Sequence, residues 1–557
     1  MLRLICPTVV VVMTLALAIS LFPAVAAAQR RDAVVIGTAQ EPAGLGPWWT
    51  LAVGVMVENS VSQELVSRNE KWQLIPVLAE KVPTIKDGDW EVLPGGKMRL
   101  TWKIRRGLTW HDGKPLTALD VRVTYGMLRN PRSPTVSRFI LRKIDNMLVP
   151  NENDPYTLIE QWNERYPFAN DHGRDWPHRP YPRHILEPTY LSDPAKLRAH
   201  PYFRAPIGSG PFKFKEWVAG SHTTFEAYEA YKGPGGSPRI RTLTYRYILD
   251  STVLQANVIA GQVDATDINN FSCEQMAQIE RRNSQVAAHY IPALLWEHVD
   301  FNHDHPWLKD KRVRQAIAHA LDRSAISEVS CLGGRQPVAH TWLPQRHYGY
   351  NPNVKKYDYS PDRARALLAE AGWATVGPDG IRRNARGERF EISIMTTAGN
   401  AIREQTQQIM KDHLRAVGID LKIDNRPASV LFGQITRRRQ YPHLVMYAWV
   451  FSPVTDGFAL WHSRQIPREA NNYEGNNTPG YSNPEVDRLE EAIVQELDEA
   501  KRKQLLMRQQ EIWAEDLPSI PLVFRLALLT NKKSIRNVKP VQLGSVYLPW
   551  NANEWQQ

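Results

Sequence analysis

Short apolar strands and capped helices alternate along this chain, and the alternation constrains its fold more than any other feature. Segment 33–37 is an apolar strand that ends at a glycine, and segment 99–104 alternates polar with apolar residues as a half-buried strand does. Thr117 and Asp120 have the spacing of a capping box at a helix start. The same patterns predict strands over 241–249, 390–396, 420–423, 444–450 and 519–524, and helices that start after Ser360, Asn483 and Asp498. The sequence therefore predicts an α/β protein.

The length of the chain adds a second constraint. A single hydrophobic core stops growing at roughly 250–300 residues, whereas this chain has 557. The composition, with 43% hydrophobic and 23% charged residues, is that of a globular protein and excludes a low-complexity or disordered chain. The sequence contains no internal repeat and no long linker. We therefore expect at least two lobes joined by short crossings of the chain.

The N-terminus has the pattern of a secretory signal peptide over residues 1–28. Arg3 precedes an apolar run over 9–22, and Pro23 is followed by the small residues 24–28 with alanines at the −3 and −1 positions. An uncleaved anchor is the alternative, because 25 uncharged residues in a row could span a bilayer. Pro23 breaks the helix just before the small residues and favours cleavage. We expect a mature chain that begins at Gln29 in the periplasm.

The chain is basic, since Lys and Arg outnumber Asp and Glu by 69 to 58. Its basic runs, such as 437–439 and 501–503, are short, and acidic residues are interspersed through most of the chain. Such runs are typical of solvated helix faces and ends. We therefore expect no nucleic-acid partner.

The mature chain would keep two cysteines, Cys273 and Cys331, which lie 58 residues apart. The pair could form a disulfide or remain two small, reduced core residues. The sequence favours the reduced pair.

The standard catalytic motifs are missing from the sequence. Gly208-Ser209-Gly210 lacks the spacing of a nucleophile elbow and predicts a tight turn. The segment 303–305, His-Asp-His, predicts a polar turn rather than a metal site, and His111 beside Asp112 predicts a structural turn. We therefore expect a binding protein without a catalytic residue, metal or cofactor. A secreted hydrolase remains the less favoured alternative.

The 18 tryptophans point to a ligand cleft, because large aromatic side chains supply apolar surface together with a polar N–H group. Most of them should lie in the core. Those in predicted loops or at strand ends are the candidate ligand contacts, namely Trp48, Trp49, Trp449 and Trp461.

Several motifs in a fixed order resemble the peptide/nickel-type solute-binding proteins of ABC importers, solute-binding protein family 5. The resemblance covers nearly all of the mature chain. It is carried by LTWKIRRGLTWHDGKPLTALDVRVTYGML at 100–128, PIGSGPFKFKEWVAG at 206–220, IAGQVDATDI at 259–268, FNHDHPWLKDKRVRQAIAHALDR at 301–323, YSPDRARALLAEAGW at 359–373, GYSNPEVDRL at 480–489 and IWAEDLPSIPLVF at 512–524.

The resemblance implies the bilobal periplasmic-binding-protein fold with an extra subdomain in the first lobe. By analogy, the core of lobe I takes residues 29–67, 205–290 and 525–557, the inserted subdomain takes 68–204, and lobe II takes 291–524. Such proteins close on a small solute by hinge motion and present it to an inner-membrane ABC permease. We expect a monomer.

The resemblance also assigns candidate ligand residues. Trp449 matches a tryptophan of the second lobe that packs against the ligand backbone. In peptide binders of the family an acidic residue follows it closely and pairs with the ammonium group of the peptide. Here Ser452 stands in that stretch and the first acid is Asp456. Ser452 is a candidate donor to a ligand carbonyl and Asp456 a candidate for binding the amine, while a simple turn is the plainer interpretation of both. For Trp48 and Trp49, packing between lobe I and its subdomain is weighed against ligand binding. Peptide is the favoured ligand; a glycoside, an opine-like conjugate or a metal chelate are the alternatives.

Overall fold

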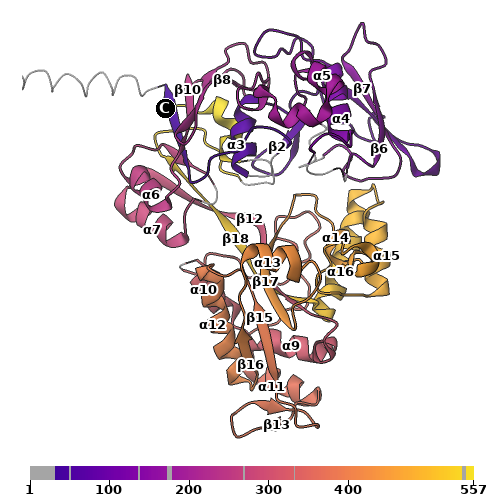
Figure 1. The fold of residues 1–557 in the computed structure, drawn as a ribbon, viewed down its shortest axis with the longest axis vertical. Helices are drawn as coiled ribbons and strands as arrows, with labels where there is room; N and C mark the ends of the chain where they lie inside the picture. Colours follow the sequence, from indigo (N-terminus) through magenta and orange to yellow (C-terminus); the bar gives the residue numbers. More distant parts are fainter. Residues whose placement is uncertain are drawn as a thin grey trace, which may run out of the picture.

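The computed structural model describes residues 32–48, 52–135, 138, 140–171, 178–267, 270–331, 333–541 and 547–557. The expected signal peptide at 1–28 and the candidate Trp49 lie outside these residues. Figure 1 shows two bodies, one above the other, that are joined by β12 and β18. The bilobal α/β fold expected from the sequence is therefore confirmed.

One sheet runs through both lobes. Within the described residues it has ten strands in the order β16-β15-β17-β12-β18-β11-β1-β10-β9-β8. β1 pairs in parallel with β10 and β11, and β15 pairs in parallel with β16 and β17, whereas β12 and β18 are antiparallel to each other and to their outer neighbours. The strands are β1 Ala33–Thr38, β8 Phe212–Val218, β9 His222–Ala227, β10 Thr242–Tyr247, β11 Ala265–Thr266, β12 Val286–Phe301, β15 Glu391–Met395, β16 Asp420–Ile423, β17 Leu444–Val450 and β18 Ser519–Lys532.

The crossings between the lobes are longer than the sequence suggested. β12 has 16 residues and β18 has 14, and the two strands pair with each other along most of their length. Their register shifts between Pro292 and Trp296 and again between Glu297 and His298. A proline lacks the N–H group that a regular ladder needs and is tolerated at such a bulge. The expectation of short crossings is thus wrong: the link is a two-stranded ribbon with an irregular centre.

The first lobe covers its part of the sheet with helices on both sides. α3 packs near β8 and the C-terminal turn, while α6 and α7 pack against each other and α7 lies along β12 (Figure 1). The buried residues of β1 and β10, such as Ile36 and Leu243, form its core together with Val57 of α3. The helices are α3 Ala52–Val61, α6 Ser251–Ile259 and α7 Cys273–Arg282.

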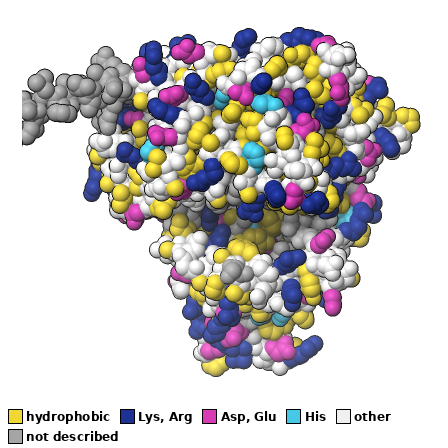
Figure 2. All heavy atoms as spheres, turned by 45° about the horizontal axis from the view of Figure 1, so that its top comes forward, with side chains coloured by type: hydrophobic (Ala, Val, Ile, Leu, Met, Phe, Trp, Pro, Cys, Tyr) yellow, Lys and Arg dark blue, Asp and Glu magenta, His cyan; other side chains and the backbone are white. Residues whose placement is uncertain are grey.

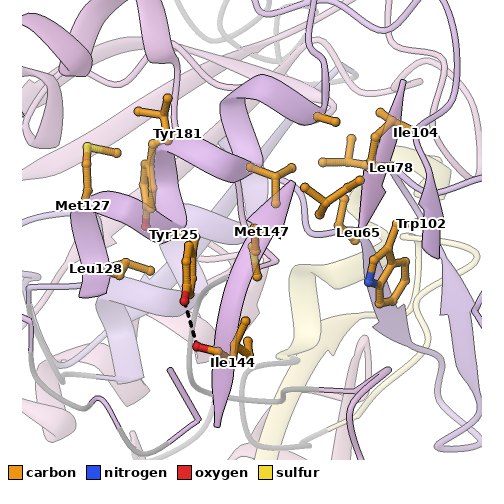
Figure 3. Close-up of a cluster of buried hydrophobic side chains, with 14 of the residues drawn as sticks. Leu65, Leu78, Trp102, Ile104, Tyr125, Met127, Leu128, Ile144, Met147 and Tyr181 are labelled. Atoms are coloured by element: carbon orange, nitrogen blue, oxygen red, sulfur yellow. Dashed lines mark hydrogen bonds between the residues drawn. The ribbon is translucent and has the colours of Figure 1, made fainter. Parts of the chain in front are cut away.

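A second, separate core lies between residues 48 and 203. A four-stranded sheet of order β4-β5-β7-β6 packs against α4 and α5. Figure 3 shows Tyr125 of α4 donating a hydrogen bond to the carbonyl oxygen of Ile144, at 2.8 Å. The predicted capping box of Thr117 and Asp120 starts α4. We propose 68–204 as the limits of this inserted subdomain. Its elements are β3 Leu74–Pro76, β4 Trp90–Val92, β5 Met98–Lys103, β6 Ile144–Leu148, β7 Thr157–Trp162, α4 Ala118–Arg129 and α5 Arg183–Ser192, and β2 Val66–Arg68 lies across its first limit.

The second lobe surrounds its part of the sheet with helices from 306 to 516. The predicted caps Ser360, Asn483 and Asp498 accept hydrogen bonds from the first turns of α11, α15 and α16. Its elements are α8 Pro306–Lys309, α9 Lys311–Ala320, α10 Arg323–Ser330, α11 Pro361–Glu370, β13 Thr375–Val376, β14 Arg382–Arg383, α12 Ala401–Ala416, α13 Ala428–Val430, α14 Phe458–Trp461, α15 Pro484–Ile493 and α16 Glu499–Asp516. Across the described part of the chain no helix is long and apolar enough to cross a membrane.

The two cysteines correct a prediction. Cys273 and Cys331 form a disulfide, not the reduced pair that the sequence favoured. Cys273 is the first residue of α7 and Cys331 follows α10, so two distant helix ends meet beside the ribbon of β12 and β18. Both side chains are buried in one cluster with Leu528 of β18. The covalent bond therefore ties α7, which packs along β12, to α10, which packs on β18.

Replacing both cysteines, Cys273→Ser with Cys331→Ser, should destabilise the protein. A disulfide that closes a loop of 58 residues lowers the conformational entropy of the unfolded chain. This raises the free energy of unfolding by up to about 4 kcal/mol. Urea unfolding of the oxidised wild type and the double variant measures this difference. Adding a thiol reductant should shift the wild type toward the variant and leave the variant unchanged. Identical unfolding curves for the oxidised wild type and the variant would show that the bond carries no stability.

Candidate functional site

The space between the lobes is hollowed, and Figure 2 shows hydrophobic side chains on the floor of this hollow. Two cavities lie close to the ribbon of β12 and β18. One, of about 450 Å³, is lined by Trp449 and is called here the Trp449 cavity. The other, of about 160 Å³, is lined by residues of β12, β18, α7 and α12 and is called the hinge cavity.

The Trp449 cavity is built on the end of β17. The sequence of this strand is almost wholly apolar and β-favouring, and residues 444–447 are buried in the sheet. Tyr447 donates a hydrogen bond of 2.6 Å to Asp300 of β12, which fixes the strand. The half-buried ring of Trp449 packs edge-on against Tyr447 at 5.7 Å between centroids. Trp449 thus presents an immobilised aromatic surface to the cavity.

The opposite wall of the Trp449 cavity is a loop with an unusual backbone. Asn472 and Tyr473 both have left-handed φ angles, 53° and 56°, and Gly475 has φ 107°. A side chain at Gly475 would meet the carbonyl oxygen of Gln465 at 2.1 Å, so only glycine fits there. These constraints place Tyr473 and Glu474 on the cavity. A bulky residue in this conformation costs free energy, and such residues gather at binding sites.

Charged groups also line the Trp449 cavity. Arg437 and Glu474 both face it, together with Phe432, Thr478 and Asn476. Glu474 is exposed, and within the residues that the structure describes no cation forms an ion pair with it. The cavity therefore offers an aromatic surface, one free carboxylate and one guanidinium, which suits a ligand with both a cationic and a polar group.

The hinge cavity lies on the other face of the sheet. Trp296 and Glu297 are neighbours in β12, so their side chains point to opposite faces, and Trp449 is the residue opposite Trp296. Glu297 accepts from Arg403 of α12 at 2.6 Å and forms a second ion pair with Arg525 of β18 at 2.6 Å. Burial opposes ionisation of Glu297, but Arg525 and Arg403 hold its pKa below its usual value. Three elements of the ribbon and lobe II are thereby joined at one carboxylate.

Ser452 and Asp456, the two polar residues expected at the site, both accept hydrogen bonds from backbone N–H groups of their own loop. Ser452 forms a turn: its hydroxyl accepts from the Val454 N–H, and its own N–H donates to Thr455 Oγ1 at 2.7 Å. Asp456 accepts from the N–H of Phe458 at 3.1 Å, and desolvation raises its pKa to about 6. The role of Ser452 and Asp456 in ligand binding remains a prediction.

Two of the candidate tryptophans are core residues in this conformation. Trp48 is 3% exposed and packs edge-on against Phe203 of the inserted subdomain at 5.7 Å, which is the packing role weighed against binding for it. Trp461 is 1% exposed and packs against Trp296, Trp342 and Trp513. Neither offers side-chain surface to the cleft.

The sequence singled out other polar residues that the structure places in turns and contacts. His111 bridges the inserted subdomain to Gly208 and Gly210: its Nδ1 accepts from the N–H of Gly208, and its Nε2 donates to the carbonyl of Gly210. Burial lowers the pKa of His111 to about 4, so the ring is neutral. His303 approaches the Pro518 carbonyl rather than a metal-binding cluster. These residues hold segments of the fold together.

Sequence reasoning missed Glu474, Arg437 and the ion cluster at Glu297. Two left-handed residues precede Glu474; asparagine often adopts this conformation but tyrosine rarely does, so the sequence does not predict the backbone at Tyr473. The partners of Glu297 lie 106 and 228 residues away along the chain. No local pattern could have linked them.

Replacing Glu297 by glutamine should destabilise the protein strongly at neutral pH. Removing one partner leaves buried guanidinium charge uncompensated, which costs about 3 kcal/mol or more. Because the pKa of Glu297 is lowered in the folded state, its contribution is complete above the ordinary value of 4.5 and is lost as the pH falls further. Urea unfolding at pH 7 and at successively lower pH measures this. The exposed Glu391, paired with Arg389, is the matched control, and Glu391→Gln should change stability by less than about 1 kcal/mol. Equal effects of the two substitutions would contradict a structural role for the cluster.

Comparison with known proteins places this geometry in a family. The model of the bacterial extracellular solute-binding proteins, family 5, matches residues 73–467. The oligopeptide-binding protein AppA of Bacillus subtilis is 30% identical over 505 residues, which cover 88% of this chain and 86% of AppA. A crystal structure of an oligopeptide-binding protein from Thermus thermophilus with a pentapeptide is 32% identical, with a TM-score of 0.71 over 95% of this chain and 96% of that one. The structure of AppA with a nonapeptide gives 26% identity and a TM-score of 0.69 over 94% and 98%. The chain belongs to the bacterial extracellular solute-binding proteins of family 5.

Proposed function

We propose that this protein captures peptides in the cleft between its lobes and delivers them to an inner-membrane ABC permease. The observation that carries the proposal is the Trp449 cavity, in which an immobilised indole, a free carboxylate and a guanidinium meet at the end of β17. An extended peptide has flat peptide planes and side-chain CH groups that pack on an indole, an ammonium group that pairs with a carboxylate, and carbonyl oxygens that accept from a guanidinium.

The relatives support the same ligand class. The proteins from Thermus thermophilus and Bacillus subtilis that share more than a quarter of their residues with this chain hold a pentapeptide and a nonapeptide. Their bilobal form and their length match this chain over more than nine tenths of it. Capture by a monomer in the periplasm, after removal of residues 1–28, completes the proposal. Binding alone, without chemistry on the peptide, is all that the role requires.

We propose Glu474 as the contact for the ammonium group of the peptide. Its carboxylate lines the same cavity as Trp449, whereas Asp456 lines none of the cavities described here and accepts a backbone N–H. Asp456 is the second candidate, and burial raises its pKa to about 6. A carboxyl with a pKa of about 6 would become protonated as the pH falls from 7 to 5. It would then no longer form an ion pair with the ammonium group of the peptide.

Peptides of two to five residues should raise the melting temperature, and Trp449→Ala should weaken their binding. Ligands that bind only the folded state stabilise it in proportion to their affinity. Loss of a rigid aromatic contact typically costs about 2 kcal/mol, a factor of about 30 in Kd. Calorimetry with a di- to pentapeptide library measures the effect. The matched control is Trp307→Ala, since Trp307 packs against Trp373 and Phe390 and lines neither cavity.

The library also tests the proposal as a whole. No rise in melting temperature with any peptide would contradict peptide capture, and hydrolysis of a bound peptide would contradict a pure binding role. Unchanged affinity of Trp449→Ala, alongside normal binding by the wild type, would reduce Trp449 to a packing residue.

Glu474→Gln should weaken binding of peptides with a free amine by about tenfold, because a charge-assisted hydrogen bond is lost. N-acetylated peptides should bind both proteins equally. Asp456→Asn should leave affinity unchanged, and the wild type should bind equally at pH 7 and pH 5. An affinity that falls between these pH values and becomes independent of pH in Asp456→Asn would instead assign the ammonium group to Asp456.

A further inference from the structure

A third and larger cavity, of about 740 Å³, lies between the inserted subdomain and lobe II. One wall is the hairpin of β2 and β3 with the segment 167–171, and the other includes Arg346, Tyr348 and the start of α16. Pro453 and Val454 also line it, four and five residues beyond Trp449. Its volume is in the range of ligand pockets. It is called here the insert cavity.

The lining of the insert cavity carries more positive than negative charge. It includes four cationic side chains, Arg68, Lys71, Arg346 and Arg502, and two carboxylates, Asp171 and Glu499. Arg68 pairs with Asp171, so that carboxylate is already occupied. For the other three cations, the described chain supplies no carboxylate within ion-pair distance.

Arg502 is the most constrained of these cations. It is 4% exposed, and its Nε and Nη1 donate to the hydroxyl of Tyr348 and the carbonyl of Glu496, at 2.9 and 2.7 Å. These neutral acceptors position the guanidinium but do not cancel its charge. A buried charge without a counter-ion is costly. The Nη2 group makes no hydrogen bond to any residue in the described ranges, so it remains available to an anion.

Arg346 and Trp72 meet across the cavity. The guanidinium of Arg346 lies 4.7 Å from the ring centre of Trp72, and it donates to the carbonyl of Glu70 at 3.0 Å. Partial burial lowers the pKa of Arg346, as expected where no anion offsets it. Trp72 has a left-handed φ of 68°, and its buried Nε1 has no acceptor among the described residues. This indole N–H group can therefore donate to an acceptor that binds in the cavity.

The positive field of this cavity also reaches His347. Burial is the main cause that lowers the pKa of His347 to about 3, and the charges of Arg68 and Arg502 add to the effect. Aromatic walls complete the surroundings: Phe168 and Tyr348 flank the Arg502 guanidinium at 4.9 and 5.3 Å. The cavity thus combines apolar surface, unneutralised cations and an unused indole N–H group.

We infer that the insert cavity binds a carboxylate of the transported solute, and that Arg346, Arg502 and Lys71 select for it. The inference rests on the proposed peptide-binding function. It assigns a site to the carboxylate end of the peptide, in addition to the site proposed at Glu474 for the ammonium end. A carboxylate accepts from several N–H groups at once, and a guanidinium fork matches its geometry. Since the walls come from two bodies, a solute held there adds contacts that favour the closed form.

The experiment compares pools of mixed-sequence pentapeptides and nonapeptides that end in a free carboxylate with the same pools amidated at the C-terminus. Binding is measured by calorimetry on the wild type, Arg346→Gln, Lys71→Gln and the control Arg363→Gln. Lys71 and Arg346 are both exposed, and substitution of Arg346 removes only its contacts with Trp72 and the carbonyl of Glu70. Arg363 is an exposed arginine on α11 that does not line the cavity. Citrate and succinate serve as separate carboxylate probes.

We expect the wild type and Arg363→Gln to bind free-acid pools at least tenfold more tightly than amidated pools. Arg346→Gln should lose most of this preference, Lys71→Gln part of it, and both should retain affinity for the amides. Equal binding of acids and amides by the wild type would overturn the inference and leave peptide capture intact.

The small carboxylates separate the remaining outcomes. In one outcome the wild type binds citrate or succinate but neither peptide pool, and Arg346→Gln abolishes this binding. That result would support the carboxylate site and contradict peptide capture. Absence of binding by all probes would overturn both. A preference for acids that survives in Arg346→Gln and Lys71→Gln would place the carboxylate elsewhere and overturn the inference.

Discussion

Two paired strands, β12 and β18, carry the chain between the lobes and make both lobes parts of one sheet. Because side chains alternate along a strand, this ribbon divides the cleft region into two faces. Trp296 and Trp449 lie opposite each other on one face, while Glu297 lies on the other with Arg403 and Arg525. The irregular register between Pro292 and His298 coincides with this cluster. The interrupted ladder and the ion cluster therefore lie at the same point of the ribbon.

The disulfide adds a covalent constraint beside the same ribbon. Cys273 and Cys331 fix the start of α7 to the end of α10, and Cys273 lines the hinge cavity together with Glu297. Between the inserted subdomain and lobe II the contacts are non-covalent: Arg346 touches Trp72 and the carbonyl of Glu70, and Arg502 packs on Phe168. An exposed cation–π contact contributes about 0.5–1 kcal/mol. The two sides of the cleft thus differ in kind, because one carries a covalent bond and the other carries only non-covalent contacts.

Local patterns in the sequence predict most of the helices and strands, but they do not predict most residues of the candidate site. Caps such as Thr117 and Ser360 define helix starts through contacts within a few residues, so the sequence predicts them directly. Pro292 hid strand β12, since proline argues against a central strand unless a bulge accommodates it. The strand predicted over 519–524 covers only the first part of β18. The disulfide, the Glu297 cluster and the burial of Trp461 depend on residues far apart in the chain. Glu474 depends on backbone angles that Asn and Tyr do not specify.

No acid follows Trp449 closely, since Ser452 stands in that segment. The charges of the two cavities near this segment give a physical reason for that. Trp449 lines a cavity with Glu474, and the loop that follows it leads within five residues to Val454, which lines the insert cavity with its surplus of cations. Under the proposed function, the carboxylate of one cavity and the cations of the other would bind the two ends of a zwitterionic peptide and orient it. An acid in place of Ser452 would stand in the stretch that leads from one cavity to the other, and its charge would oppose that of the nearby cations. The acid at Glu474 instead belongs to the Trp449 cavity alone.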